Sequence, residues 1–145
     1  MKPLDLSTRP PRSPREKLAG LVFLPRTIDK MRALLPGGNI GPYKIDGMSV
    51  RVLTAIGVTV EDLQAEVARA ASDEEVAAWV LEHSEASKRD EANRIAMQRS
   101  IRDVPPENLD RIRQMYPDYE KIASGLFVDI IDADDAAMFA REERS

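Results

Sequence analysis

The expected fold of this 145-residue chain is decided by residues 9–38, R-P-P-R-S-P-R-E-K-L-A-G-L-V-F-L-P-R-T-I-D-K-M-R-A-L-L-P-G-G. Ser13, Pro14 and Glu16 are typical of a helix start: a hydroxyl cap, a proline at the first helical position, and a carboxylate three residues after the cap. Apolar residues then recur at the spacing of one helical face, at Leu18, Leu21, Val22, Pro25, Ile28, Met31 and Leu35. Because Pro36-Gly37-Gly38 cannot continue a helix, we predict a helix over residues 14–35.

Pro25 lies inside this helical pattern. A proline there removes the hydrogen bond to the carbonyl of Leu21 and bends the helix. No Ser, Thr, Asp or Asn stands directly before Pro25 to cap a new helix. We therefore expect one bent helix in preference to two separate ones.

Further helix signals follow a loop at residues 36–47 that is rich in Gly and Pro. Thr59 with Asp62, and Ser72 with Glu75, are typical of helix starts, and Gly57 is typical of a helix end. We expect helices at residues 49–56, 59–71, 72–83, 85–101 and 105–117, and a terminal helix from about Asp134. Residues 126–131 form either a short buried helix or an extended segment.

These elements predict an all-α fold, a single small helical domain of six or seven helices around a Pro-kinked N-terminal helix. Residues 1–12 contain three prolines and few apolar groups, so we expect an extended N-terminal arm. Residues 13–103 then form the helical core domain. Residues 104–145 form a C-terminal helical extension packed on the same domain.

The composition limits the class of protein. The chain has no cysteine, which excludes disulfides, a thiol nucleophile and cysteine-based metal sites. Its longest apolar run, residues 18–24, is far shorter than the roughly 20 residues that cross a bilayer. We expect a cytoplasmic protein that has no contact with a membrane.

The charge is distributed unevenly along the chain. Residues 1–44 contain nine Lys and Arg against three Asp and Glu, a net charge of +6; since the whole chain carries −4, residues 45–145 carry −10. The basic segment attracts an anion or nucleic acid, or it docks on the acidic body of its own chain or of a second copy. We favour docking. Nucleic-acid binding is not expected, because no aromatic residues interleave the basic ones and the body is acidic.

One cluster of side chains is a candidate ligand site. Arg26, Asp29 and Lys30 share one side of the predicted helix, with Arg32 beside them. In a functional interpretation Arg26 and Lys30 hold an anionic group while Asp29 orients Arg26, and Tyr43 completes the site. In a structural interpretation Asp29 forms an ordinary surface ion pair with Arg26 or Arg32.

Other patterns lead to no chemistry. His83 is the only histidine, so no catalytic triad or multi-histidine metal site can assemble, and we expect it to cap a helix end. The glycine loop at residues 37–41 lacks the Gly-Lys-Ser/Thr ending of a phosphate-binding loop. Asp129, Asp132, Asp134 and Asp135 lack the remaining residues of a calcium loop, and helix capping by Asp132 or Asp134 explains them. We predict no catalytic residue, no metal and no cofactor.

Several separated motifs resemble one known family. They are R-S-P-R-E-K-L-x-G at residues 12–20, L-P-R-x-I-D-K-x-R-A at 24–33, Gly41-Pro42-Tyr43, Leu53-x-x-Ile56-Gly57, and S-D-E-E-V-A-A-W-V at 72–80. In this order they resemble the bacterial domain-of-unknown-function family 5069, over residues 3–83 and more weakly at residues 129–134. The resemblance implies a small helical cytoplasmic domain and brings no activity, cofactor or catalytic residue with it.

Two functions follow as expectations. The first is a non-enzymatic interaction or self-assembly module, a homo-oligomer joined through the N-terminal arm. The alternative is a protein that binds a small anionic metabolite, or an enzyme, with a pocket beside Pro25. The residues define no reaction.

Overall fold

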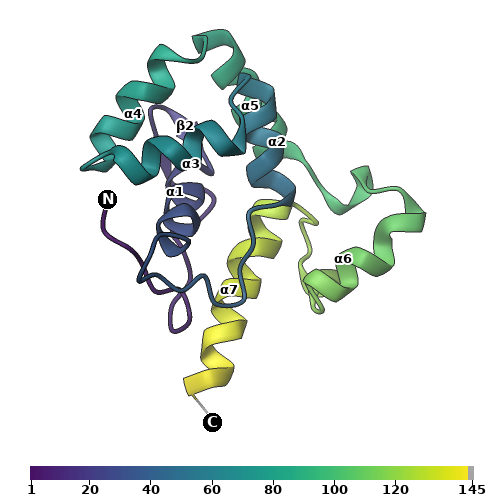
Figure 1. The fold of residues 1–145 in the computed structure, drawn as a ribbon. Helices are drawn as coiled ribbons and strands as arrows, with labels where there is room; N and C mark the ends of the chain where they lie inside the picture. Colours follow the sequence, from purple (N-terminus) through teal and green to yellow (C-terminus); the bar gives the residue numbers. More distant parts are fainter. Residues whose placement is uncertain (144–145) are drawn as a thin grey trace.

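Seven α-helices and one short β-hairpin form most of the regular structure of residues 1–143, which are described by a computed structural model with side chains up to residue 140 (Figure 1). The helices are α1 (Leu24–Ala33), α2 (Gly47–Ile56), α3 (Val60–Arg69), α4 (Asp73–Glu82), α5 (Ala86–Gln98), α6 (Leu109–Met115) and α7 (Phe127–Glu143). The hairpin joins β1 (Lys17–Leu18) to β2 (Leu21–Val22), and short 3-10 turns occur at Ile101–Asp103, Pro106–Asn108 and Tyr119–Lys121. The protein is thus a mostly α single domain.

The prediction of one bent helix over residues 14–35 is wrong. Helix α1 begins at Leu24, and Pro25 occupies its first turn, where the missing N–H costs nothing. The preceding residue, Phe23, has a φ of 69°, a left-handed conformation through which a helix cannot run. The expected capping contacts at Ser13 do form, since its hydroxyl accepts from the N–H of Arg15 and its own N–H donates to Glu16, but they stabilise a single turn.

The predicted helix starts and ends in the middle of the chain are confirmed. The hydroxyl of Thr59 accepts from the N–H of Asp62 at 3.1 Å, and that of Ser72 from the N–H of Glu75 at 3.3 Å. Gly57 ends α2 with a φ of 77°. Helix α5 packs on α2 and buries only a narrow face that includes Ala92 and Ala96.

Helix α7 is continuous from Phe127, so the expected break near Asp134 is wrong. Its first turns bring Phe127, Val128 and Ile131 into the same apolar core as α1 to α5. The β-forming residues at its start are therefore helical because they are buried against other helices, and a weak strand preference does not outweigh that packing. Asp132 and Asp134 lie within this helix, and the capping role predicted for them is wrong.

The N-terminal arm packs on the body of its own chain. Leu6 is fully buried, its N–H donates to the carbonyl of Asn39 at 2.7 Å, and the carbonyl of Leu4 accepts from Asn39 at 3.0 Å. Gly41 has a φ of 59°, and a Cβ at this position would lie 2.6 Å from the carbonyl oxygen of Leu6. The glycine loop is therefore shaped to let the arm approach its backbone closely.

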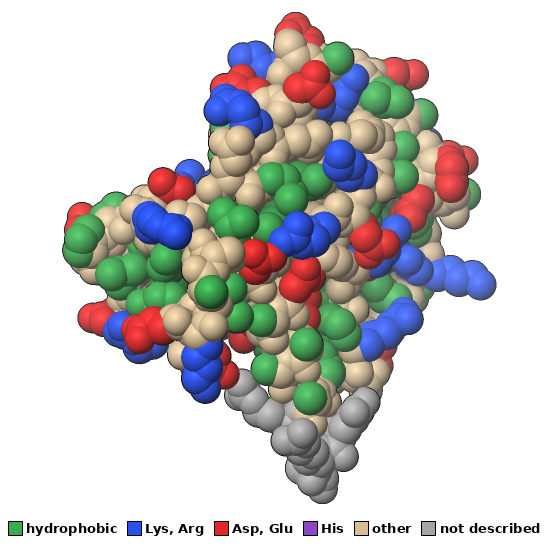
Figure 2. All heavy atoms as spheres, turned by 180° about the vertical axis from the view of Figure 1, so that it is seen from behind, with side chains coloured by type: hydrophobic (Ala, Val, Ile, Leu, Met, Phe, Trp, Pro, Cys, Tyr) green, Lys and Arg blue, Asp and Glu red, His purple; other side chains and the backbone are tan. Residues whose placement is uncertain are grey.

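Two arginines of the N-terminal segment form ion pairs within the same chain. Arg12 bonds to Asp29 and Asp73, while Arg15 contacts Asp129 and Asp132. Figure 2 shows acidic and basic side chains interspersed over the face opposite to that of Figure 1. Docking on the chain's own body, one of the alternatives left open by the sequence, is thus the observed arrangement.

Residues 100–125 leave the body as a lobe that carries α6 at the side of the molecule, and α7 then returns to the body (green and yellow in Figure 1). The core of the body and the lobe meet through side chains such as Ile112 and Tyr116. Within residues 1–143, no helix has both the length and the apolar character that crossing a bilayer requires.

Candidate functional site

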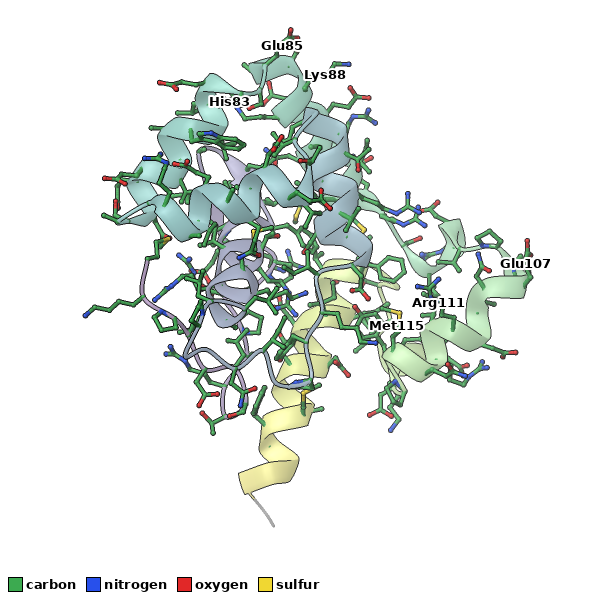
Figure 3. All side chains as sticks on the ribbon, viewed as in Figure 1. His83, Glu85, Lys88, Glu107, Arg111 and Met115 are labelled. Carbon is green, nitrogen blue, oxygen red and sulfur yellow. The ribbon has the colours of Figure 1, made fainter. Side chains whose placement is uncertain are left out.

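A pocket of about 450 Å³ lies where α1, the loop before α2, α6 and α7 meet. It is lined by Arg26, Lys30, Pro42, Tyr43, Lys44, Asp46, Arg111, Gln114, Met115, Tyr116, Asp134 and Met138. Figure 3 shows Arg111 and Met115 on the side of α6 that faces α7. The structure therefore brings three of the four predicted site residues, Arg26, Lys30 and Tyr43, to one pocket.

Arg26 is held by an acid that is distant in sequence. Its guanidinium donates to both oxygens of Asp135, at 2.7 and 3.2 Å, and only 4% of Arg26 is exposed. The hydroxyl of Tyr43 donates to the same carboxylate at 2.9 Å, and the guanidinium lies 5.5 Å from the centre of the Tyr43 ring. Arg26, Asp135 and Tyr43 thus form a buried network in which the charge of Arg26 is already neutralised.

Asp29 does not contribute to this pocket. Its carboxylate accepts from the backbone N–H of Arg12 at 2.8 Å and from the Arg12 guanidinium at 3.0 Å. The expected pairing of Asp29 with Arg26 or Arg32 is wrong, because the arm supplies a closer cation. Asp29 fastens the arm to α1 and does not line the pocket.

Lys30 is a buried cation of the pocket with no acidic partner at contact distance. Its ammonium donates to the carbonyl of Lys44 at 2.9 Å, and only 7% of the residue is exposed. Among residues 1–140, no carboxylate oxygen lies within 4 Å of this ammonium. Burial, together with the charge of Arg26, lowers the pKa of Lys30 to about 8, against the opposing effect of Asp46 and Asp135.

Two tyrosines line the pocket in their protonated forms. Burial raises the pKa of Tyr116 to about 12. Burial and the neighbouring Asp135 carboxylate also raise the pKa of Tyr43 well above its usual range. Both therefore keep a hydroxyl proton at neutral pH. That of Tyr43 is directed to Asp135.

Other predicted features lie away from the pocket. His83 ends α4, where its Nδ1 atom is 2.8 Å from the carbonyl oxygen of Trp79 and its ring stacks on the indole. Figure 3 shows His83 beside Glu85 and Lys88, far from Arg111 and Met115. In the part of the chain that the structure describes, no group of three or more His, Asp and Glu side chains could hold a metal ion.

Sequence reasoning did not find the residues that complete the pocket. Arg111 lies on α6, Tyr116 directly follows this helix, and Asp134 lies on α7. All three are some 80 or more positions beyond Arg26 and Lys30. In the sequence, Asp135 is recognisable only as one of the four aspartates at residues 129–135. No local pattern joins these residues to α1, so their proximity becomes visible only in the fold.

Comparison with known proteins identifies the family. The model of a domain of unknown function, DUF5069, matches residues 8–137, which is nearly the whole chain. This chain therefore belongs to the DUF5069 family. No curated protein matches it significantly.

Proposed function

We propose that this protein binds a small anionic molecule in the pocket between α1, α6 and α7. The ammonium of Lys30 contacts the charge of the ligand, and the hydroxyl of Tyr116 is available as a second donor. Arg26, Tyr43 and Asp135 act as positioning residues that hold this side of the pocket in place. The observation that carries the proposal is a buried lysine on a pocket wall with no carboxylate at contact distance.

A buried cation without a counter-charge is costly for a folded protein. The depressed pKa of Lys30 is a measure of that cost, since burial disfavours its charged form. Lys30 is still mostly protonated at neutral pH, because its pKa of about 8 lies above 7. An anion in the pocket would supply a negative charge at contact distance and would be held by a charge-assisted hydrogen bond.

Binding should depend on pH in a defined direction. Below about pH 8 Lys30 carries its charge, and the affinity for an anion should stay constant. Above this pH the amine becomes neutral, so the affinity should fall as pH rises. A ligand held only by arginines would show no such decline in this range.

The test is a thermal-shift screen with small carboxylates, keto acids and phosphate esters. We expect at least one anion to raise the melting temperature of the wild-type protein and of Lys17→Met, a control at an exposed lysine of β1, but not of Lys30→Met. Equal responses of Lys30→Met and the wild type would overturn the proposal. So would a screen in which no anion stabilises the wild-type protein.

Self-assembly through the N-terminal arm stays a prediction. The arm's apolar side chains Leu4 and Leu6 and its cation Arg12 have partners within the same chain. Because these side chains already have partners in their own chain, they leave fewer free groups that could bind a second copy of the protein. We therefore rank anion binding above assembly, and light scattering at tens of micromolar protein would detect the latter.

A further inference from the structure

A second pocket of about 320 Å³ adjoins the first one on the side of α2 and α5. The two pockets share Asp46, Arg111, Met115 and Tyr116, so they form neighbouring parts of one hollow beneath the α6 lobe. The walls of the second pocket are largely apolar, with Met48, Val104, Pro105, Ile112 and Phe127 among them. A ligand that fills both parts would extend from Lys30 toward α2.

Three arginines from three separate elements line this second pocket. Arg51 lies on α2, Arg99 directly follows α5, and Arg111 lies on α6. Through residue 140, none of the three has a carboxylate oxygen within 4 Å. Arg12, Arg15 and Arg26, by contrast, each have such a partner.

Two of the three cations, Arg51 and Arg99, are close enough for one to affect the other. Burial, and after it the charge of Arg51, lowers the pKa of Arg99, while Asp103 opposes the shift. Asp46 is the one acidic residue among the lining residues of this pocket. Three guanidinium groups against one carboxylate leave the pocket with an excess of positive charge.

Ordinary structural roles account for only part of this cluster. Arg99 caps the C-terminal end of α5, where a cation is favourable, and its guanidinium lies 5.9 Å from the centre of the Phe127 ring. Neither role requires Arg51 and Arg111 to face the same hollow. Like charges that converge against too few carboxylates repel one another, and a bound anion reduces that repulsion.

We propose that Arg51, Arg99 and Arg111 bind a phosphate group, and that the ligand is a phosphorylated small molecule whose remainder extends toward Lys30. A planar carboxylate is satisfied by one arginine in a bidentate pair, whereas arginines from three elements suit a tetrahedral dianion approached from several sides. The proposal of a phosphate site depends only on these three arginines and does not require Lys30. The extension toward Lys30 rests on the function proposed above.

Inorganic phosphate and pyrophosphate are the probes for this site, measured by isothermal titration calorimetry at low ionic strength. We expect Arg51→Gln and Arg99→Gln each to weaken binding by about tenfold, as expected when one charge-assisted contact is lost. Arg94→Gln, at an exposed position of α5 outside both pockets, should bind like the wild type. Circular dichroism of each variant checks that it is folded.

Absence of phosphate and pyrophosphate binding at millimolar concentrations would overturn the proposal, as would equal affinities of the wild type and both pocket variants. Lys30→Met separates the two proposals, because it should leave phosphate binding unchanged while removing the response to the anion that Lys30 contacts. A short oligonucleotide can also be tested against the same site. If it bound more tightly than pyrophosphate, and if Arg51→Gln and Arg99→Gln weakened that binding, the ligand would be a nucleic acid and the small-molecule proposal would be wrong.

Discussion

Asp135 lies within α7 and joins two side chains from distant parts of the chain. It accepts hydrogen bonds from Arg26 and from Tyr43, and both partners are buried. Removing one member of a buried ion pair leaves an uncompensated charge, which is more costly than losing the pair as a whole. Asp135 is therefore the residue on which the geometry of the first pocket depends most.

We predict that Asp135→Ala lowers the free energy of unfolding by about 3–5 kcal/mol, because it leaves the Arg26 guanidinium buried and unpaired. Asp132→Ala, on the same helix, removes a partly exposed pair with Arg15 at 3.5 Å and a hydrogen bond from the Ser13 hydroxyl at 2.8 Å. It should lower the free energy of unfolding by only about 1 kcal/mol. Urea denaturation of both variants measures the difference. A loss of stability from Asp135→Ala that is as small as that from Asp132→Ala would show that Arg26 does not depend on Asp135.

Lys30 should destabilise the unliganded protein in a way that depends on pH. Its pKa is about 8 in the folded chain, against an ordinary value of 10.5. Between these values the unfolded chain binds more protons, so the contribution of Lys30 to stability improves as pH rises from about 8 to 10.5. Below pH 8 the full penalty of burying the cation is present.

Lys30→Met should therefore raise the free energy of unfolding at pH 7 by about 1–3 kcal/mol, after the loss of its hydrogen bond to Lys44 is subtracted. The gain should shrink toward zero near pH 10.5. Chemical denaturation at pH 7 and at pH 10 checks this trend, with Lys17→Met as the control. A gain that does not change with pH would contradict it.

At the scale of elements, the hairpin before α1 is the segment whose structure the local sequence pattern predicts wrongly, since that pattern indicates a helix. Residues 13–22 carry a helix cap and helical spacing, yet they form one turn and two short strands. Their apolar positions are nevertheless buried, since Leu21 and Val22 belong to the core. The hydrophobic pattern was therefore right about burial and wrong about backbone shape.

The hairpin turn is strained at Ala19. Ala19 and Gly20 have φ values of 54° and 68°, and a left-handed conformation is unfavourable for a residue with a Cβ atom. We predict that Ala19→Gly raises the free energy of unfolding by about 0.5–1 kcal/mol. The same change at Ala78, which is exposed in α4, should lower it by about 1 kcal/mol. Thermal denaturation measures both variants. A loss of stability in Ala19→Gly as well as in Ala78→Gly would contradict the left-handed conformation of Ala19.

At the scale of the whole molecule, the arm and α7 together enclose the pocket side of α1. Leu4 and Leu6 form a small apolar cluster with Ala33 and Tyr43, and Met138 and Phe139 of α7 pack against it. This cluster includes Tyr43 and packs against its ring. The arm is thus part of the support of the candidate site, whatever its role in assembly.

We predict that Leu6→Ala lowers the free energy of unfolding by about 2–4 kcal/mol, because Leu6 is 0% exposed and its removal leaves a cavity. Leu34→Ala, at a leucine that is 52% exposed, should change it by less than about 0.5 kcal/mol. Chemical denaturation of the two variants distinguishes them. If Leu6→Ala is as harmless as Leu34→Ala, the arm does not dock as described.

The sequence by itself determined the mostly helical fold, the caps at Thr59 and Ser72, the end at Gly57 and the family. Each depends on short motifs, and the residues within one motif lie only a few positions apart. It also led to Arg26, Lys30 and Tyr43, though not to their roles. The tertiary structure alone decided that Asp29 binds the arm, that Asp135 neutralises Arg26, and that α6 closes both pockets. The contacts of Asp29 and Asp135 join residues that are 17 and 109 positions apart in the sequence. Such residues meet only because the apolar faces of separate elements pack together, and no local sequence pattern predicts which faces meet.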